Sequence, residues 1–278
     1  AQDDEDRYGG NTWDNGYPSG GNTWDSYTGI DLFSSAGQDV PGADGIGDTP
    51  YVILAGLDVD HYPIMPAILP CTTPPAGLIN WWPGNGSTQD IMSGLDAELR
   101  NGATYGTGLV GQAFSLDGVD DFVDVADDPA LKVGTNDFTV EFWVNFNTTS
   151  SEQILVEKYI ETENAETRSG WMLSKMADNS IRLHLGHLEG GTVDSAPQTI
   201  SDNTWTHFAL RRSGDVFSIF MNGAEIASGT YSVNVDSTSS LKFGHRGNPD
   251  DTPGSVDWRG IYLNGRIDEA SIYGRALT

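Results

Sequence analysis

The sequence is poor in basic residues. Its 278 residues include 14 Lys and Arg against 40 Asp and Glu, which leaves a formal net charge of −26. A field of this sign repels the phosphates of nucleic acids and the headgroups of anionic lipids. We therefore expect no nucleic-acid partner. Because no apolar run reaches the roughly 18 residues that a membrane span requires, we also expect no membrane insertion.

Cysteine is nearly absent as well. The single one, Cys71, stands in the Pro-rich stretch "LPCTTPP" and has no partner within the chain, so it is a free thiol or a bridge to another chain. The opening "AQDDEDRYGG" has neither the basic nor the apolar region of a signal peptide, which indicates a mature or excised piece. Few lysines, abundant Gly, Asn, Thr and Asp, and 8 Trp are typical of a secreted or cell-surface β-protein.

Three zones follow one another along the chain. Residues 1–66 consist largely of turn-forming sequence and contain "GNTWD" twice, at Gly10 and at Gly21. Residues 67–76, "AILPCTTPPA", read as a Pro-rich linker, because proline fixes φ and biases the residue before it towards extended geometry. Residues 77–278 alternate between apolar and polar side chains, which predicts β-strands.

The alternation is clearest in "DFTVEFWVNFN". One face of this strand carries only apolar residues, namely Phe138, Val140, Phe142, Val144 and Phe146. The other face carries Thr139, Glu141 and Asn145 and, as an exception, Trp143. Roughly a dozen short strands of this kind, with turns every 8–12 residues, predict an all-β, two-sheet antiparallel sandwich. Between two of these runs, Asn222-Gly223 supplies the positive φ angles of a type I′ hairpin turn.

The motifs of the third zone resemble a known family. They read "GLINWWPGNGSTQDI" from Gly77, "SLDGVDDFVDV" from Ser115, "FTVEFWV" from Phe138, "WTHFAL" from Trp205 and "GRIDEASIYGRAL" from Gly265. In this order they resemble the laminin G-like jelly-roll domains of the concanavalin A-like lectin and glucanase fold. The resemblance implies a jelly roll over residues 77–278, whose last strand pairs near the first and ties the ends of the domain together.

The first zone resembles a different family. Residues 11–29, 44–51 and 60–64 are similar to the C-terminal end of NosD-type periplasmic β-helix proteins, but the solenoid coils of that family do not precede them. A repeat unit cannot bury its face alone. The resemblance therefore implies a loop-rich, β-helix-cap-like segment over residues 1–66 that packs on the sandwich or on another copy of the chain.

Acidic residues of the first zone suggest a calcium site. Asp39, Asp44 and Asp48 stand in the Gly-rich loop "DVPGADGIGDTPY", and Asp31 is a further candidate. Carboxylates beside backbone carbonyls that glycines turn inward suit Ca²⁺, which takes six to eight oxygen ligands. The alternative is that these Asp residues only form turns by accepting hydrogen bonds from their own backbone.

The laminin G-like resemblance implies a second, structural calcium ion. It would lie between Asp268 on the last strand and loop oxygens near Asp90 or Asp96; the alternative is a surface acid on an edge strand. The acids of "LDGVDDF" are instead interpreted as turn residues: Asp117, Asp120 and Asp121.

Nothing in the sequence marks a catalytic site. Glucanases of this fold need two carboxylates on one strand face, about 5 Å apart in retaining enzymes. The one dense acidic run, "ETENAETR" at 161–168, is interpreted as a solvated loop, and His207 as an ordinary strand residue. Sugar sites use exposed aromatic rings beside a few polar groups. Three aromatic residues in or beside loops are the candidates: Trp171, Trp258 and Tyr262.

These patterns together predict a non-catalytic, calcium-stabilised module, secreted or on the cell surface, that binds glycans or extracellular matrix. The alternative function is a structural subunit of an extracellular filament, sheath or surface layer, assembled through strand or cap contacts. The unpaired Cys71 and exposed strand edges would favour such self-assembly.

Overall fold

The computed structural model describes residues 33–34, 40–41, 46, 51–54, 58–61, 74–160, 168–186, 191–246 and 261–278. The chain divides into two compact units, Ala1–Pro74 and Pro75–Thr278, and the division falls within the 67–76 segment. In its described part the first unit has two short antiparallel pairs: β1 (Phe33–Ser34) with β2 (Val40–Pro41), and β3 (Tyr51–Leu54) with β4 (Asp58–Asp60). The β-helix-cap resemblance of this unit stays a prediction.

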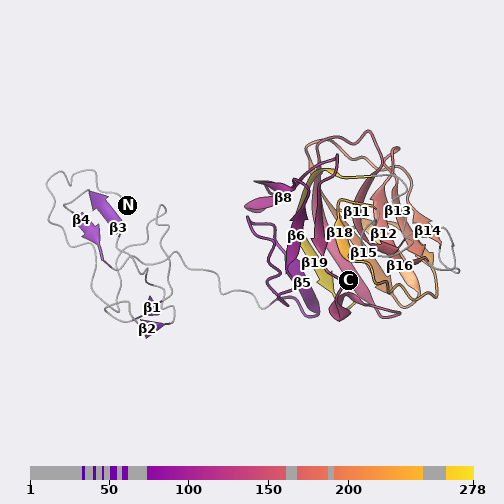
Figure 1. The fold of residues 1–278 in the computed structure, drawn as a ribbon, viewed down its shortest axis with the longest axis horizontal. Helices are drawn as coiled ribbons and strands as arrows, with labels where there is room; N and C mark the ends of the chain where they lie inside the picture. The colour runs from indigo at the N-terminus through magenta and orange to yellow at the C-terminus, as the bar shows by residue number, and fades with distance from the viewer. Residues whose placement is uncertain are drawn as a thin grey trace. The chain divides into compact units, whose positions relative to one another are not determined.

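The second unit consists of two antiparallel sheets (Figure 1). The first has eight strands in the order β17-β16-β15-β10-β19-β8-β7, and β5 also pairs with β19. Their bounds are β5 (Leu78–Trp82), β7 (Thr104–Thr107), β8 (Gln112–Asp117), β10 (Phe138–Phe146), β15 (Trp205–Ser213), β16 (Val216–Met221), β17 (Ala224–Thr230) and β19 (Asn264–Tyr273).

The second sheet has seven strands in the order β14-β13-β12-β11-β18-β9-β6. Their bounds are β6 (Ala97–Arg100), β9 (Phe122–Val125), β11 (Gln153–Ile160), β12 (Ser169–Lys175), β13 (Ile181–Gly186), β14 (Thr192–Asp194) and β18 (Leu241–Phe243). A single 3₁₀ turn, η1 (Pro129–Leu131), is the one helical element among the described residues. Within those residues no helix has the length and apolar character to cross a membrane.

Each sheet turns one apolar face to a shared core. Along β10, Val140, Phe142 and Val144 are buried in that core, whereas Glu141 and Trp143 lie on the opposite, outer face and are partly exposed. Side chains from both sheets belong to one continuous buried cluster. The predicted all-β, two-sheet antiparallel jelly-roll sandwich is therefore confirmed.

Two details of the predicted connectivity are confirmed as well. Asn222 and Gly223, between β16 and β17, have φ angles of 49° and 80°, as a type I′ turn requires. The last strand, β19, pairs with the first strand of the unit, β5, with Ile272 opposite Asn80. This pairing joins the two ends of the domain within one sheet.

Phe243 of β18 connects the two sheets through aromatic contacts. Its ring meets Trp82 of β5 edge-on at a centroid distance of 5.9 Å, and Phe142 of β10 edge-on at 6.3 Å. All three side chains are 0% exposed. Edge-to-face aromatic pairs of this kind add to the free energy gained from burial alone.

We predict that Phe243→Ala lowers the free energy of unfolding by about 3–5 kcal/mol, because it removes a buried ring and leaves a cavity between the sheets. Phe243→Leu, which keeps most of the apolar volume, should cost clearly less. Urea unfolding followed by tryptophan fluorescence measures both. Equal losses for the two variants would contradict a central role for the ring contacts.

Candidate functional site

The outer face of the eight-stranded sheet carries the candidate site. Because side chains alternate along a strand, the burial of Phe142 forces Glu141 and Trp143 of β10 onto this face. Trp143 lies opposite His207 of β15 in the register of the sheet. On the other side of β10, strands β19 and β5 add Glu269 and Trp81.

These side chains line a hollow of about 420 Å³, which we call the outer-face groove. Its walls are formed by Pro75, Leu78, Trp81, Val110, Glu141, Trp143, His207, Glu269, Ser271 and Tyr273. The volume is within the range of small-molecule sites, roughly 300–1,000 Å³. Aromatic rings from three strands and two carboxylates thus face one cavity.

Glu141 is held by two neighbours. The Tyr273 hydroxyl donates a hydrogen bond of 2.9 Å to Oε1 of Glu141, and His207 Nε2 lies 3.5 Å from Oε2. The hydrogen bond with His207 keeps the pKa of the Glu141 carboxyl below its ordinary value, against the opposing effect of burial. Burial and the negative charge of Glu141 raise the pKa of Tyr273 to about 12. Tyr273 is thus a neutral donor and Glu141 a carboxylate at neutral pH.

Glu269 is aimed by a β-bulge. The register of β10 against β19 shifts between Glu141 and Trp143, and Glu269 has a φ of 53°, a left-handed conformation that costs a non-glycine residue on the order of 1–3 kcal/mol. Its Oε2 accepts a hydrogen bond of 2.8 Å from the indole Nε1 of Trp81. Burial, and secondarily the charge of Asp268, raise the pKa of Glu269. The bulge therefore orients one carboxylate and one indole ring together.

The groove continues along the sheet into a smaller hollow of about 150 Å³, which also borders on Glu141 and His207. Arg211 stands there, but its guanidinium covers the Phe220 ring at 4.6 Å and contacts Glu225 at 3.5 Å. The ring of Trp143, in the larger hollow, lies beside that of His207, which borders on both, with centroids 5.1 Å apart. Together the hollows offer an extended, mainly apolar surface with acceptors at defined points.

Asp268, the predicted calcium ligand of the last strand, is fully buried beside the groove. Its Oδ2 accepts hydrogen bonds from the backbone N–H of Leu109 (2.7 Å) and Val110 (3.0 Å), and its Oδ1 accepts one from Glu269 (3.0 Å). The alternative interpretation of Asp268, a surface acid on an edge strand, is therefore wrong, because Asp268 is buried and β19 lies inside its sheet. Its contacts anchor the loop whose Val110 forms part of the groove wall. Calcium binding by Asp268 stays a prediction.

The loop acids named with Asp268 make contacts of their own. Asp90 is buried and accepts hydrogen bonds from Asn80, Trp81 and Ser93, and Asp96 accepts one from the backbone of Asp90. The hydrogen bonds from Ser93 and the backbone of Trp81 keep the pKa of Asp90 low although burial opposes them. They organise the loop that follows β5.

The predicted aromatic ligand contacts do not gather at the groove. Trp171 is 2% exposed and packs against Phe138 in the core, so the expectation that its ring stands open to a ligand is wrong. Tyr262 stacks on His245 with centroids 4.6 Å apart and does not line the groove. Trp258 and the predicted calcium ligands of the first zone lie outside the described residues: Asp31, Asp39, Asp44 and Asp48.

Sequence reasoning missed Glu141, Glu269 and His207 as members of a site. His207 is on a strand, as expected, but it also faces a cavity. One signal was available, since Trp143 stands on the polar side of a strongly alternating strand, where a large ring has no core to fill. Glu269 gave no such signal, because the bulge that aims it depends on strand register.

A comparison with protein families now places the chain. The family described as the Concanavalin A-like lectin/glucanases superfamily matches residues 117–278, which is more than half of the 278 residues. The chain belongs to this superfamily. The match confirms the laminin G-like resemblance over residues 117–278. A search among curated proteins gives no match.

Several solved structures share the fold. Domain 4 of AbnA, an extracellular arabinanase from Geobacillus stearothermophilus, in complex with arabinotriose, matches with a TM-score of 0.55 and 20% identity over 72% of this chain and 94% of that one. The binding domain of Botulinum Neurotoxin DC in complex with SialylT matches with a TM-score of 0.51 and 14% sequence identity. The match covers 73% of this chain and 48% of the toxin domain. A mutant Trypanosoma rangeli sialidase matches with a TM-score of 0.51 and 16% sequence identity. The match covers 74% of this chain and 32% of the sialidase.

At these identities the likeness shows the fold alone. This chain covers less than half the length of the toxin domain and of the sialidase. The fold thus occurs in carbohydrate-binding domains and in a glycosidase, and the difference between the two must be sought in the groove itself.

We predict that one tyrosine of the folded chain ionises only near pH 12 and that this step is missing in Tyr273→Phe. Because folding raises this pKa above its ordinary value of 10.0, the resulting stabilisation is complete below pH 10 and is lost as the pH rises through about 12. Difference spectra of tyrosinate absorption isolate this residue from the other tyrosines.

Glu141→Gln is the companion variant. It removes a negative charge next to the phenol, so Tyr273 should ionise at lower pH, though still above its ordinary value because burial is the larger cause. A Tyr273 titration that is the same in wild type and Glu141→Gln would show that the hydrogen bond does not form as described.

Proposed function

We propose that the chain is a non-catalytic, extracellular module that binds neutral glycans in the outer-face groove. The observation that carries this proposal is the arrangement of Trp81, Trp143 and Tyr273 around one cavity together with Glu141 and Glu269. Aromatic faces pack against the C–H faces of sugar rings, and carboxylates accept hydrogen bonds from sugar hydroxyls. A cleft of mostly apolar walls with a few polar groups is the usual form of a small-ligand site.

The charge of the groove restricts the class of glycan. Its lining includes two carboxylates and neither Lys nor Arg among the described residues. Arg211 lines the smaller hollow, where it is engaged by Phe220 and Glu225. A sialic acid, uronic acid or sulfate group would meet the two carboxylates in a chain of net charge −26. Neutral sugars, and amino sugars with a positive charge, avoid this repulsion.

The contacts of the two glutamates support binding rather than hydrolysis. Both oxygens of Glu141 are already in contact with Tyr273 and His207, and Glu269 is bonded to Trp81. In a retaining glycosidase one carboxylate attacks the sugar, and the two contacts that hold Glu141 oppose this role for it. We infer that the glutamates hold the rings in place and accept hydrogen bonds from the ligand.

The similar structures agree with this proposal in two respects. The arabinanase domain was solved with arabinotriose and belongs to an extracellular enzyme, and the toxin domain was solved with SialylT. They support a glycan ligand and a location outside the cell, while the charge of this groove favours the neutral class. The filament or surface-layer alternative and the calcium ion of the first zone stay predictions.

We predict that Trp143→Ala weakens binding of neutral oligosaccharides at least about tenfold, equivalent to about 1.4 kcal/mol, because it removes a wall of the groove. Trp205→Ala is the matched control, since Trp205 is also a partly exposed strand tryptophan but does not line the groove. A glycan array with neutral, amino and acidic sugars identifies the ligand, and calorimetry with the strongest neutral binder measures the loss.

Three outcomes would count against the proposal. Equal losses in Trp143→Ala and Trp205→Ala would place the site elsewhere. Preferential binding of sialylated or uronic sugars would contradict the charge argument. Release of reducing ends from a bound oligosaccharide, abolished by Glu269→Gln, would make the groove an active site.

A further inference from the structure

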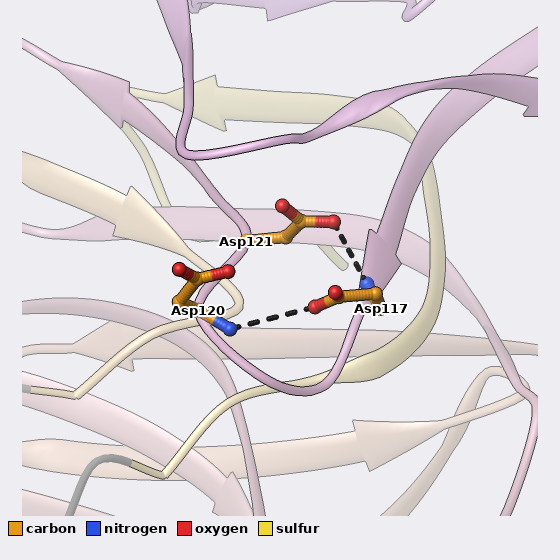
Figure 2. A group of neighbouring side chains, drawn as sticks. All are labelled: Asp117, Asp120 and Asp121. Atoms are coloured by element: carbon orange, nitrogen blue, oxygen red, sulfur yellow. Dashed lines mark hydrogen bonds between the residues drawn. The ribbon is translucent and has the colours of Figure 1, made fainter.

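A second polar cavity lies in the second unit, away from the outer-face groove. Asp117 ends β8, Asp121 precedes β9, and Asp120 stands in the turn between them (Figure 2). One carboxylate oxygen from each lies within 4.8 Å of those of the other two. No residue that lines this cavity also lines the groove.

Part of this arrangement is ordinary turn chemistry. Asp117 Oδ1 accepts hydrogen bonds from the backbone N–H of Val119 (2.7 Å) and Asp120 (3.4 Å), and Asp121 Oδ2 accepts one from the N–H of Asp117 (3.0 Å). Figure 2 shows the bonds that join the three acids. The interpretation of these acids as turn residues is confirmed for Asp117, but it does not account for the remaining carboxylate oxygens.

The unusual atom is Oδ1 of Asp121. Asp121 is only 5% exposed, and this oxygen is buried without a hydrogen-bond partner in the described structure. An unsatisfied buried carboxylate oxygen is unfavourable, because it has lost water and gained no donor. Turn formation does not require this atom to be buried, since Oδ2 alone bonds to Asp117.

Gly102 lies close to this oxygen. A Cβ atom added at Gly102 would lie 2.9 Å from Asp121 Oδ1, so a larger residue here would displace the carboxylate. Gly102 and Asp121 line one cavity of about 460 Å³, whose other walls are Asn101, Thr104, Ser115, Leu116, Asp117, Asp120 and Asn147. Apart from Leu116, the side chains of this wall bear oxygen atoms, and none is basic.

The cavity therefore concentrates negative charge without a counter-charge. Oxygen donors without His or Cys select a hard cation over zinc or copper. Ca²⁺ tolerates six to eight oxygen ligands in irregular geometry, whereas Mg²⁺ requires a near-ideal octahedron.

We propose that this cavity is a calcium site, with Asp121 Oδ1 as the buried ligand and Asp117 and Asp120 as ligands from the turn. The ion would connect the β8–β9 turn to the β6–β7 turn, where Asn101 and Gly102 stand. Asn101 already links these turns by donating a hydrogen bond of 2.7 Å to the backbone carbonyl of Asp120.

The test titrates Ca²⁺ into the metal-free full-length chain by calorimetry, with Mg²⁺ in parallel. Asp120→Asn removes an exposed carboxylate that makes no side-chain hydrogen bond in the described structure, so folding should be preserved. Removing even an outer partner of a metal ligand weakens binding about 10–100-fold. Asp120→Asn should therefore weaken calcium binding at the site at least about tenfold.

Two further variants distinguish calcium binding in this cavity from a general effect of the protein's negative charge. Gly102→Ala keeps all the carboxylates but places a Cβ atom 2.9 Å from Asp121 Oδ1, so it displaces this ligand and should also weaken calcium binding. Glu98→Gln removes one negative charge from β6, where Glu98 pairs with Arg100 at 2.8 Å outside the cavity, and should bind like wild type. Hydrogen exchange of the turn should slow with calcium in wild type and Glu98→Gln only.

The proposal would be overturned if Asp120→Asn and Gly102→Ala bound calcium as tightly as wild type. It would also be overturned if the hydrogen exchange of the β8–β9 turn in wild type did not change on calcium addition. Any calcium bound by the first zone would persist in all four proteins, so it adds a constant heat and does not imitate the expected difference. Stronger binding of Mg²⁺ than of Ca²⁺ would likewise contradict the site described.

Discussion

The side-chain alternation of β10 is the constraint on which both the core and the groove depend. Burying Phe142 brings its ring against Phe243 of the other sheet, and the same strand geometry then leaves no choice for Glu141 and Trp143, which must face outward. A shift of one residue in register would exchange these faces. The aromatic contact between the sheets thus fixes the position of the groove as well as the stability of the domain.

The β-bulge in β19, opposite β10, gives Glu269 an orientation that strict side-chain alternation would not give it. A regular β19 would leave its side chains in strict alternation, whereas the extra residue and the left-handed φ of Glu269 direct its carboxylate to the Trp81 indole. Asp268, one residue earlier, is buried and bonds to the backbone of Leu109 and Val110. Two neighbouring acids of one strand therefore have different tasks, one in the groove and one beneath its wall.

Some of these features could be predicted from the sequence and others could not. Features of the backbone that depend on local periodicity were predictable: the alternation of "DFTVEFWVNFN", the Asn222-Gly223 turn, and the pairing of the last strand with the first. The groove was not, because it combines residues from four strands whose register the sequence does not state. Trp171 shows the opposite error, since a ring that seemed free beside a loop lies in the core.

The acidic character of the chain has different consequences at its two cavities. In the groove, the carboxylates have donors: Tyr273 and His207 contact Glu141, and the Trp81 indole bonds to Glu269. In the β8–β9 turn, Asp121 Oδ1 has no donor in the described structure, and the nearby acids add like charge. The hydrogen-bond partners of the carboxylates, rather than their number, are therefore the basis on which we propose a sugar for one cavity and a cation for the other.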